Sequence, residues 1–151
     1  MNITQKGRYA LKALLTLREA TPIKPRTLRD VASHEQIPIK FLEQIMIPLK
    51  RAGIVDSSKG KRGGYWLAER PERISLGQVI RVIDGPLSPF GKRTALESLI
   101  QKEEAHPALY EIFLEVGNAV ASILDTRSLA DICERSLQLR QQKASCGIYD
   151  I

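Results

Sequence analysis

The sequence is poor in the residues that build disulfide frameworks and membrane spans. Its 151 residues include two cysteines, Cys133 and Cys146, which are too few for a disulfide framework. No apolar run approaches the ~20 residues that a transmembrane helix requires. Lys12 interrupts the apolar stretch near the N-terminus, which therefore lacks the layout of a signal peptide. We expect a cytoplasmic protein without a membrane partner.

Residues typical of catalytic centres are also scarce. His34 and His106 are the only histidines, and neither has a serine or cysteine partner at a recognisable spacing. The stretch GKRGGYWLA at 60–68 has the glycines and lysine of a phosphate-binding loop, but Arg62 stands where such a loop needs Ser or Thr. The residues that follow favour a strand rather than a helix, so no helix N-terminus would face the loop. We expect no enzyme.

Positive charge is concentrated in the first half of the chain. The net charge is +6, and residues 1–74 hold 15 Lys and Arg against 7 Asp and Glu. Residues 75–151 hold 8 basic and 10 acidic residues, a balance of −2. This asymmetry favours a polyanion-binding half joined to a half with another task, although a merely solvated surface would show the same charge.

The first half predicts helices followed by a hairpin. Apolar spacing indicates helices over about 4–19, from Thr27, and over 37–53, with Pro38 at a first helical position and Gly53 as the C-terminal cap. Residues 54–57 and 65–68 read as strands on either side of a basic turn. A helix-turn-helix followed by such a hairpin is a winged helix.

Two features of this half carry specific expectations. Gly63 and Gly64 would permit a left-handed backbone and close approach to the wall of a DNA groove. Lys59, Lys61 and Arg62 would then reach phosphates or a narrow minor groove. Pro48 lies inside the third helix, so we expect a kink or break over 43–47.

The second half predicts a long helix with an apolar face. Ser75 and Gln78 form a capping box for a helix that ends at Gly85, and 85–106 reads as a linker with a short helix at 95–101. A helix over 107–124 follows, and Ser128 caps a last helix that frays after 142. The apolar face of 107–124 needs a partner, either the same helix of a second subunit or its own chain. The predicted interface residues are Leu109, Ile112, Phe113, Val116, Val120, Ile123 and Leu124.

Four stretches resemble a known family. TQKGRYALKALL, IPIKFLEQI, KRAGIVDSSKG with GGYWLA, and ISLGQVIRVIDG are similar to the IscR/NsrR/CymR group of bacterial winged-helix transcription regulators, the Rrf-two type. The match runs through 1–86 and continues more loosely over 106–132. The resemblance implies a homodimer that reads an inverted-repeat operator, with the helix after Pro38 in the major groove and the wing in the adjacent minor groove.

The resemblance also assigns residues to the DNA contact. The assigned residues of the first helix would touch the DNA backbone. Those at the start of the third helix would face the bases, and those of the wing would contact the minor groove. Tyr9 and Phe41 are also compatible with a core role, and Lys6 with an idle surface position. The residues are Thr4, Lys6, Tyr9, Pro38, Lys40, Phe41, Glu43, Gln44, Lys59, Lys61, Arg62, Gly63 and Gly64.

The residues that would bind a cofactor are missing. Iron–sulfur members of the group carry three cysteines just before the long helix, and 89–106 contains none. Cys133 reads as a buried inert thiol, Cys146 has no ligand spacing, and His106 stands alone beside a proline. On the first helix, where some relatives supply a further ligand, Arg8 and Lys12 cannot serve. We expect no iron–sulfur cluster and no metal.

The signal that the protein senses stays open at the level of sequence. A small molecule between the linker and the long helix and a partner protein docking there are both compatible with the resemblance, and so is a disulfide between the Cys146 residues of two subunits.

The predicted fold is mainly α with a small two-stranded β-wing, plus a long C-terminal dimerisation helix. The predicted division is a winged-helix domain at 1–86, a linker or sensor at 87–106, dimerisation helices at 107–143 and a flexible tail at 144–151. The predicted function is sequence-specific binding of double-stranded DNA as a repressor. The alternative is a winged-helix module that docks on proteins or RNA without operator specificity.

Overall fold

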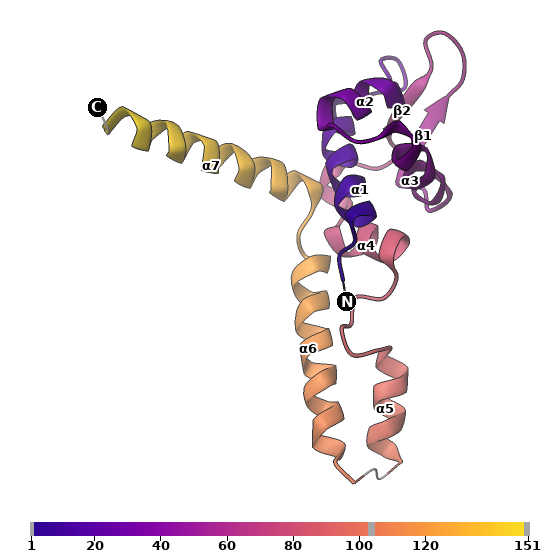
Figure 1. The fold of residues 1–151 in the computed structure, drawn as a ribbon, viewed down its shortest axis with the longest axis vertical. Coiled ribbons are helices and arrows are strands. Elements are labelled where there is room, and N and C mark those ends of the chain that lie inside the picture. The colour runs from indigo at the N-terminus through magenta and orange to yellow at the C-terminus, as the bar shows by residue number, and fades with distance from the viewer. Residues whose placement is uncertain (1, 103–104, 150–151) are drawn as a thin grey trace.

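The fold places a winged-helix unit at one end of a helical stalk (Figure 1). The computed structural model describes residues 2–102 and 105–149. The winged unit contains α1 (Gln5–Thr16), η1 (Leu17–Glu19), α2 (Leu28–Glu35), α3 (Ile39–Arg51), β1 (Val55–Ser58), β2 (Gly64–Leu67), η2 (Pro71–Arg73) and α4 (Leu76–Asp84). The stalk consists of α5 (Arg93–Gln101) and α6 (Pro107–Asp125), and α7 (Leu129–Tyr149) projects separately from the winged unit (Figure 1). The predicted fold class is confirmed.

Hydroxyl caps begin three helices of the winged unit. Thr4, Thr27 and Ser75 each accept a hydrogen bond from the backbone amide three residues later, at 3.1 Å in every case. Each bond satisfies an amide that has no partner inside its own helix, which stabilises a helix end by about 1 kcal/mol. The helix starts predicted from these residues are therefore confirmed.

The core lies where α1, α2, α3 and α4 meet. Burial of each large apolar side chain contributes roughly 1.5–3 kcal/mol, so this cluster is the main source of the unit's stability. The side chains without measurable exposure include Leu14, Leu17, Val31, Leu42, Leu49, Ile54, Ile74, Val79 and Leu129.

The third helix continues through its internal proline. α3 is helical from Ile39 to Arg51 with Pro48 inside it, so of the kink or break predicted over 43–47 the break does not occur. Buried neighbours on both sides, Met46 and Leu49, fix the chain on the core at this point. Gly53, at φ 75°, then ends the helix, because Ile54 N–H reaches Leu49 C=O at 3.0 Å and Gly53 N–H reaches Lys50 C=O at 3.0 Å.

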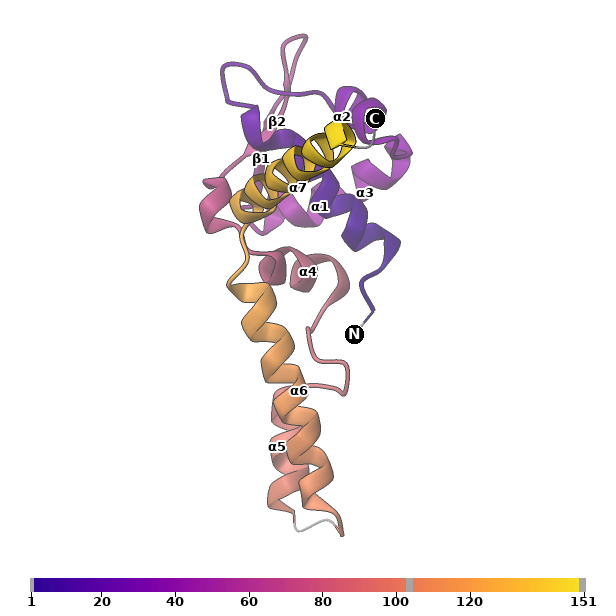
Figure 2. The same ribbon diagram turned by 90° about the vertical axis from the view of Figure 1, so that its left-hand side faces the viewer.

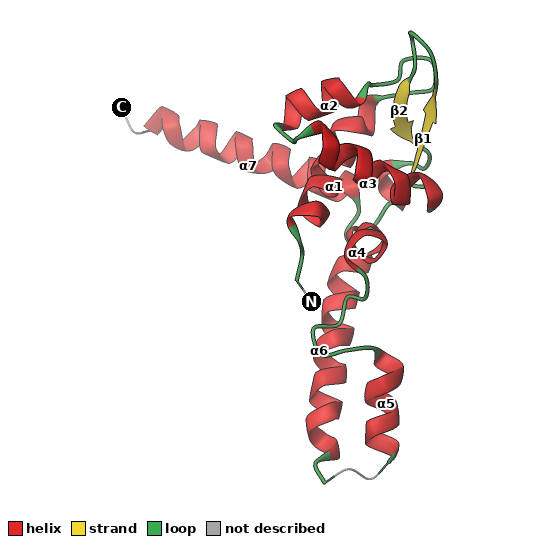
Figure 3. Cartoon of the chain, turned by 45° about the vertical axis from the view of Figure 1, so that its right-hand side comes forward, coloured by secondary structure: helices red, strands yellow, loops and turns green. Residues whose placement is uncertain are grey.

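The wing is a two-stranded antiparallel hairpin with a third backbone segment beside it. Val55 pairs with Leu67 and Ser58 with Gly64 at the two ends of the register. Arg26 adds a bridge to Tyr65, with N–H to C=O distances of 3.0 and 2.7 Å between the two backbones. The loop before α2 is thereby held against β2 (Figure 3).

The left-handed backbone predicted for Gly63 and Gly64 is wrong, and both glycines are needed for close packing of backbone at the wing. Gly60 has the left-handed backbone, at φ 107°, whereas Gly63 and Gly64 do not. A Cβ on Gly63 would collide with the carbonyl oxygen of Ser58, and a Cβ on Gly64 would collide with that of Arg26. The close approach is therefore to the protein's own backbone.

The second half forms an antiparallel hairpin of α5 and α6 and a projecting α7 (Figures 1 and 2). Stacking of Phe90 on Phe113, with ring centroids 4.2 Å apart and planes 9° apart, holds the linker against α6. α7 is helical to Tyr149, past residue 142 where fraying was predicted. Residues 150–151 of the tail predicted from 144 lie outside the described residues.

The joint between the stalk and the winged unit is tied at several points. Leu76 N–H donates to Arg127 C=O and Leu129 N–H to Ile74 C=O, each at 2.9 Å. Leu129 is buried in the winged core. Arg81 of α4 makes two hydrogen bonds, of 2.6 and 2.7 Å, to the carboxylate of Asp125 at the end of α6. These contacts, which we call the α4–α6 joint, set the direction of α6 relative to the winged unit.

The acidic partner in the α4–α6 joint should make stability depend on pH. The hydrogen bonds from Arg81 hold the pKa of Asp125 below its ordinary value of 3.8, so its contribution is present above that value and is lost as the pH falls through the lowered pKa. Because the pair is largely exposed, we expect Asp125→Asn to lower the free energy of unfolding by about 1 kcal/mol or less near neutral pH. Urea denaturation should show the difference from wild type shrinking in acid.

The matched control is Asp56→Asn, which alters an exposed aspartate of β1. A difference between wild type and Asp125→Asn that stays constant into strong acid would contradict this role for Asp125.

Candidate nucleic-acid interface

The third helix divides into a buried face and an exposed face. Leu42, Ile45, Met46 and Leu49 are at most 1% exposed, and they pack into the core. Five exposed positions recur at intervals of three and four residues, so they share the opposite side of the helix. These five, which we call the α3 face, are Lys40, Glu43, Gln44, Ile47 and Arg51, while Ile39, Phe41 and Lys50 are exposed as well.

The α3 face offers the chemistry of base recognition. A glutamine amide can donate and accept on an adenine edge, a glutamate can accept from a cytosine amino group, and a lysine can bind guanine or phosphate. An α-helix fits the width of the major groove of B-DNA. Glu43 and Gln44 therefore stand where the sequence placed them, on the free side of α3.

Ile47 is a member of the α3 face that sequence reasoning did not include. It is 60% exposed, one turn after Glu43 and Gln44. Its position could have been found from the spacing, because residues 40, 44 and 47 follow the same helical row. An exposed isoleucine on such a face can contact a thymine methyl group.

The start of α1 lies against the start of α3. The rings of Tyr9 and Phe41 meet edge to face with centroids 5.9 Å apart, and Gln5 Nε2 donates to the Tyr9 hydroxyl at 2.7 Å. Tyr9 is half-buried and packs against the core, whereas Phe41 is 39% exposed and lies on the surface beside it. Lys6 is exposed.

Thr4 is already engaged within the protein. Its Oγ1 caps α1 and donates to Asp84, and its N–H donates to Asp84 Oδ2 at 3.0 Å. Pro38 is the N-cap of α3 rather than its first helical residue, and it is exposed. The predicted residues Thr4 and Pro38 thus lie at the N-terminal ends of α1 and α3.

The wing presents basic side chains to solvent. Lys59, Lys61 and Arg62 are all exposed, at the end of the hairpin farthest from the core. The wing and α3 lie on the same side of the winged unit (Figure 3). The α3 face and the wing therefore form one surface with polar readout groups in one part and cations in another.

The described residues do not assemble a catalytic or metal centre. No cluster of three or more His, Cys, Asp or Glu side chains that could hold a metal ion occurs in residues 2–102 and 105–149. Thr16 donates to Glu35, and His34 Nδ1 lies 3.5 Å from the same carboxylate, which ties α1 to α2. Cys133 is half-buried and Cys146 is exposed.

The predicted interface residues of α6 fall on two sides of the helix. Leu109, Ile112, Val116 and Ile123 are 46%, 56%, 38% and 61% exposed. We call these four the α6 stripe. Phe113, Val120 and Leu124 are half-buried, and Phe113 stacks on Phe90 of its own chain. The stripe is thus the part of the predicted set that has no cover in the described chain.

Comparison with known proteins gives concordant matches over most of the chain. A family model described as "Rrf2: Iron-dependent Transcriptional regulator" matches residues 3–135. The HTH-type transcriptional regulator CymR of Bacillus subtilis is 36% identical over 132 residues, which are 87% of this chain and 89% of that protein.

Solved structures match in the same way. The structure of CymR, described as the global cysteine regulator of B. subtilis, superposes with a TM-score of 0.74 at 33% identity, over 89% of this chain and 98% of that one. The structure of IscR from T. potens superposes with a TM-score of 0.64 at 29% identity, over 90% and 88% of the two chains.

The basic wing yields a direct prediction. Replacing Lys59, Lys61 and Arg62 with alanine should weaken binding to duplex DNA, because these cations would no longer neutralise phosphates. The slope of log affinity against log salt should flatten by about 0.9 for each phosphate that is no longer neutralised. Dimerisation should persist. Fluorescence anisotropy across a salt series measures both affinity and slope.

The matched control removes the same charge from exposed positions of α7, through alanine at Arg135, Arg140 and Lys143. Equal losses of affinity in the wing variant and the control would mean that net charge, and not the wing, sets the affinity.

Proposed function

Since the chain belongs to the Rrf2 family of transcriptional regulators, we propose that it binds an inverted-repeat operator as a homodimer and represses transcription from it. The observation that carries this proposal is the α3 face beside the basic wing. Polar groups on a helix suit the major groove, and cations on a glycine-rich hairpin suit phosphates or the minor groove. The protein is a DNA-binding regulator and not an enzyme.

The α6 stripe supports a homodimer. Four large apolar side chains on one side of a 19-residue helix are exposed in the single chain. Identical helices can cover such a stripe for each other about a two-fold axis. In a two-fold dimer both α3 faces can meet the same duplex, and the two-fold axis relates their orientations. The operator would therefore be an inverted repeat.

A membrane-spanning role for α6 is the competing explanation of its apolar surface. By length and composition alone, Pro107–Asp125 could cross a membrane, although the sequence predicts no apolar run of this length. Glu111 and Glu115 lie in its first half, and its other side packs on α5. A carboxylate in a bilayer is costly. We therefore assign the stripe to a second subunit and the protein to the cytoplasm.

The iron named in the family description does not fit the residues of this chain. Cys133 and Cys146 lie thirteen residues apart on one helix, which separates them by about 20 Å along its axis. Among the described residues, neither belongs to a group of three or more His, Cys, Asp or Glu side chains that could hold a metal ion. A cluster needs several thiolates or equivalent ligands converging on one point. We propose that the protein works without an iron–sulfur cluster and responds to an effector instead.

Selection of a binding site from random duplexes tests the function. The purified full-length protein should enrich a motif with two inverted half-sites, and its affinity for that motif should exceed its affinity for unrelated duplexes by about 10³ or more. A module that docks on proteins or RNA would enrich no DNA motif, and that result would remove the regulator assignment.

The dimer has a separate test. Ile112→Glu combined with Ile123→Glu places charges in the α6 stripe, so the variant should run as a monomer in light scattering. Its operator affinity should fall by about 10² or more, because the second half-site no longer binds in the same complex.

The control is Ile23→Glu, at a loop position that is 97% exposed and outside α6. Persistence of the dimer in the double variant would assign the interface to another surface.

A further inference from the structure

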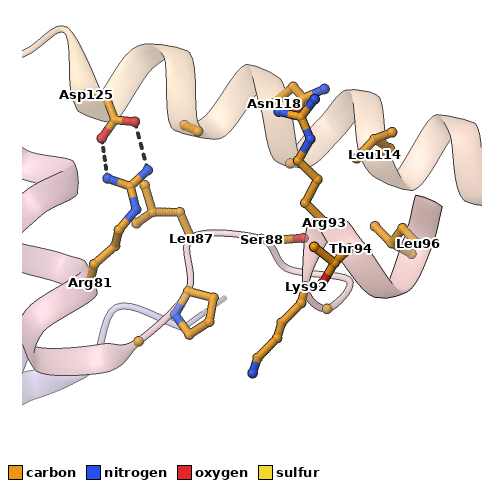
Figure 4. Close-up of a pocket in the computed structure, with 15 residues that line it drawn as sticks. Arg81, Leu87, Ser88, Lys92, Arg93, Thr94, Leu96, Leu114, Asn118 and Asp125 are labelled. Carbon is orange, nitrogen blue, oxygen red and sulfur yellow. Dashed lines mark hydrogen bonds and ion pairs between the residues drawn. The ribbon is translucent and has the colours of Figure 1, made fainter. Parts of the chain in front are cut away.

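A cavity of about 690 Å³ lies between the linker and α6 (Figure 4). It is remote from the wing, since α5 and α6 extend away from the opposite side of the winged unit (Figure 1). Its volume is in the range of pockets that hold small organic ligands. Its side chains come from α4, the linker, α5 and α6, and the ones that define its chemistry are Arg81, Leu87, Lys92, Arg93, Leu114 and Asp125.

The floor of the cavity is apolar and fixed. Leu87 and Leu96 are each 4% exposed, and Leu114 and Ala121 extend the apolar surface along α6. The linker cannot easily collapse into the cavity, because Leu87 is buried on one side of Ser88 and Phe90 stacks on Phe113 on the other. An apolar group of a ligand would therefore find preformed contact.

The rim of the cavity is cationic in an otherwise acidic half of the chain. Arg81, Lys92 and Arg93 line it, against the single carboxylate of Asp125. Residues 75–151 as a whole carry a balance of −2. Arg81 and Arg93 extend toward α6, whereas Lys92 extends away from it (Figure 4). Two guanidinium groups directed at one cavity in such a segment favour an anionic ligand over a neutral or cationic one.

The two arginines are positioned to exchange partners. Arg93 Nε lies 2.9 Å from Glu97 Oε1, and Arg81 holds Asp125. Both pairs are substantially exposed, so each is weak because water screens it. A ligand carboxylate can replace either partner with little loss, since guanidinium groups bind any carboxylate through parallel N–H donors.

The cavity stays open in the proposed dimer. Successive residues of an α-helix are about 100° apart around its axis. Leu114, Asn118 and Ala121 consequently lie nearly opposite Ile112, Val116 and Ile123 of the α6 stripe. A second subunit covering the stripe would leave the cavity accessible.

We infer that this cavity binds a small carboxylate with an apolar body, and that its occupancy is transmitted to the DNA-binding surface through the Arg81–Asp125 pair. The regulatory half of this inference rests on the proposed function, whereas binding itself does not. The apolar body lies on Leu87 and Leu114, and the carboxylate binds one of the two guanidinium groups that extend toward α6, those of Arg81 and Arg93 (Figure 4).

The route to DNA is short. Arg81 belongs to α4, which packs on α1 and α3, and Asp125 ends α6. A carboxylate that binds Arg81 competes with Asp125 and loosens the α4–α6 joint. The two winged units of a dimer then lose their fixed spacing, and affinity for a pair of half-sites falls.

The arrangement leaves no room for a larger side chain at the joint. A Cβ on Gly77 would collide with Asp125 Oδ1 and would lie 3.2 Å from Arg81 Nη1. Glycine at this position therefore lets the carboxylate of Asp125 lie on the surface of α4, within reach of Arg81, which also lines the cavity.

Benzoate and benzamide test the ligand class, because they share shape and differ in charge. Calorimetric titration of the full-length protein should show benzoate binding at roughly millimolar or better affinity, and benzamide binding about tenfold more weakly or not at all. Arg93→Gln should reduce benzoate affinity about tenfold. Lys102→Gln, an exposed lysine at the end of α5, serves as the matched control and should leave it unchanged.

The second measurement follows the effect on DNA with the selected operator. Saturating benzoate should lower operator affinity of the wild type about tenfold and change that of Asp125→Asn by less than twofold, because the pair is already broken there. Equal binding of benzoate and benzamide, no binding of either, or an unaltered affinity in Arg93→Gln would overturn the site. An equal response of operator affinity in wild type and Asp125→Asn would overturn the route.

The two proposals fail separately in this design. Operator selection that succeeds while benzoate does not bind removes the ligand site and keeps the proposed function. Benzoate binding that persists while no motif is selected removes the proposed function and keeps the ligand site.

Discussion

The attachment of α3 to the core is the constraint on which the rest of the molecule depends. Four buried side chains fix the rotation of α3 about its own axis. They are Leu42, Ile45, Met46 and Leu49. That rotation places the α3 face outside, where every member except Ile47 is polar or charged, and Ile39 and Phe41 at the start of the helix are exposed beside it. A helix held less firmly would offer the same side chains at variable angles, and hydrogen bonds to base edges tolerate little error in direction.

Much of the winged unit could be predicted from local patterns. Caps at Thr27 and Ser75 act within one turn of their own helix, so three-residue spacing is sufficient to locate them, and apolar periodicity located the helix that Thr4 caps. The wing was harder. The need for glycine at Gly64 arises from the backbone of Arg26, which is far away in the sequence, and no local pattern records that contact.

The differences in the second half have the same origin. The apolar width of α6 was visible in the sequence, but Phe113 finds its partner Phe90 across the linker, within one chain. Periodicity identifies an apolar side chain and not the surface that covers it. Pro48 is the converse case, since a local rule predicts a disrupted helix at proline, whereas the helix is continuous where its neighbours Met46 and Leu49 are buried.

Arg26 has a consequence for the thermodynamics of recognition. Its backbone bridges Tyr65 of the wing, its Nε lies 2.7 Å from Asp30, and its Nη1 donates to Thr16 C=O at 3.0 Å. The base of the wing is thereby connected to α1 and α2 before any nucleic acid arrives. Ordering a free hairpin on binding would cost conformational entropy, and a hairpin already held in place avoids most of that cost. A residue whose charge is satisfied inside the protein thus contributes to affinity for a polyanion through rigidity alone.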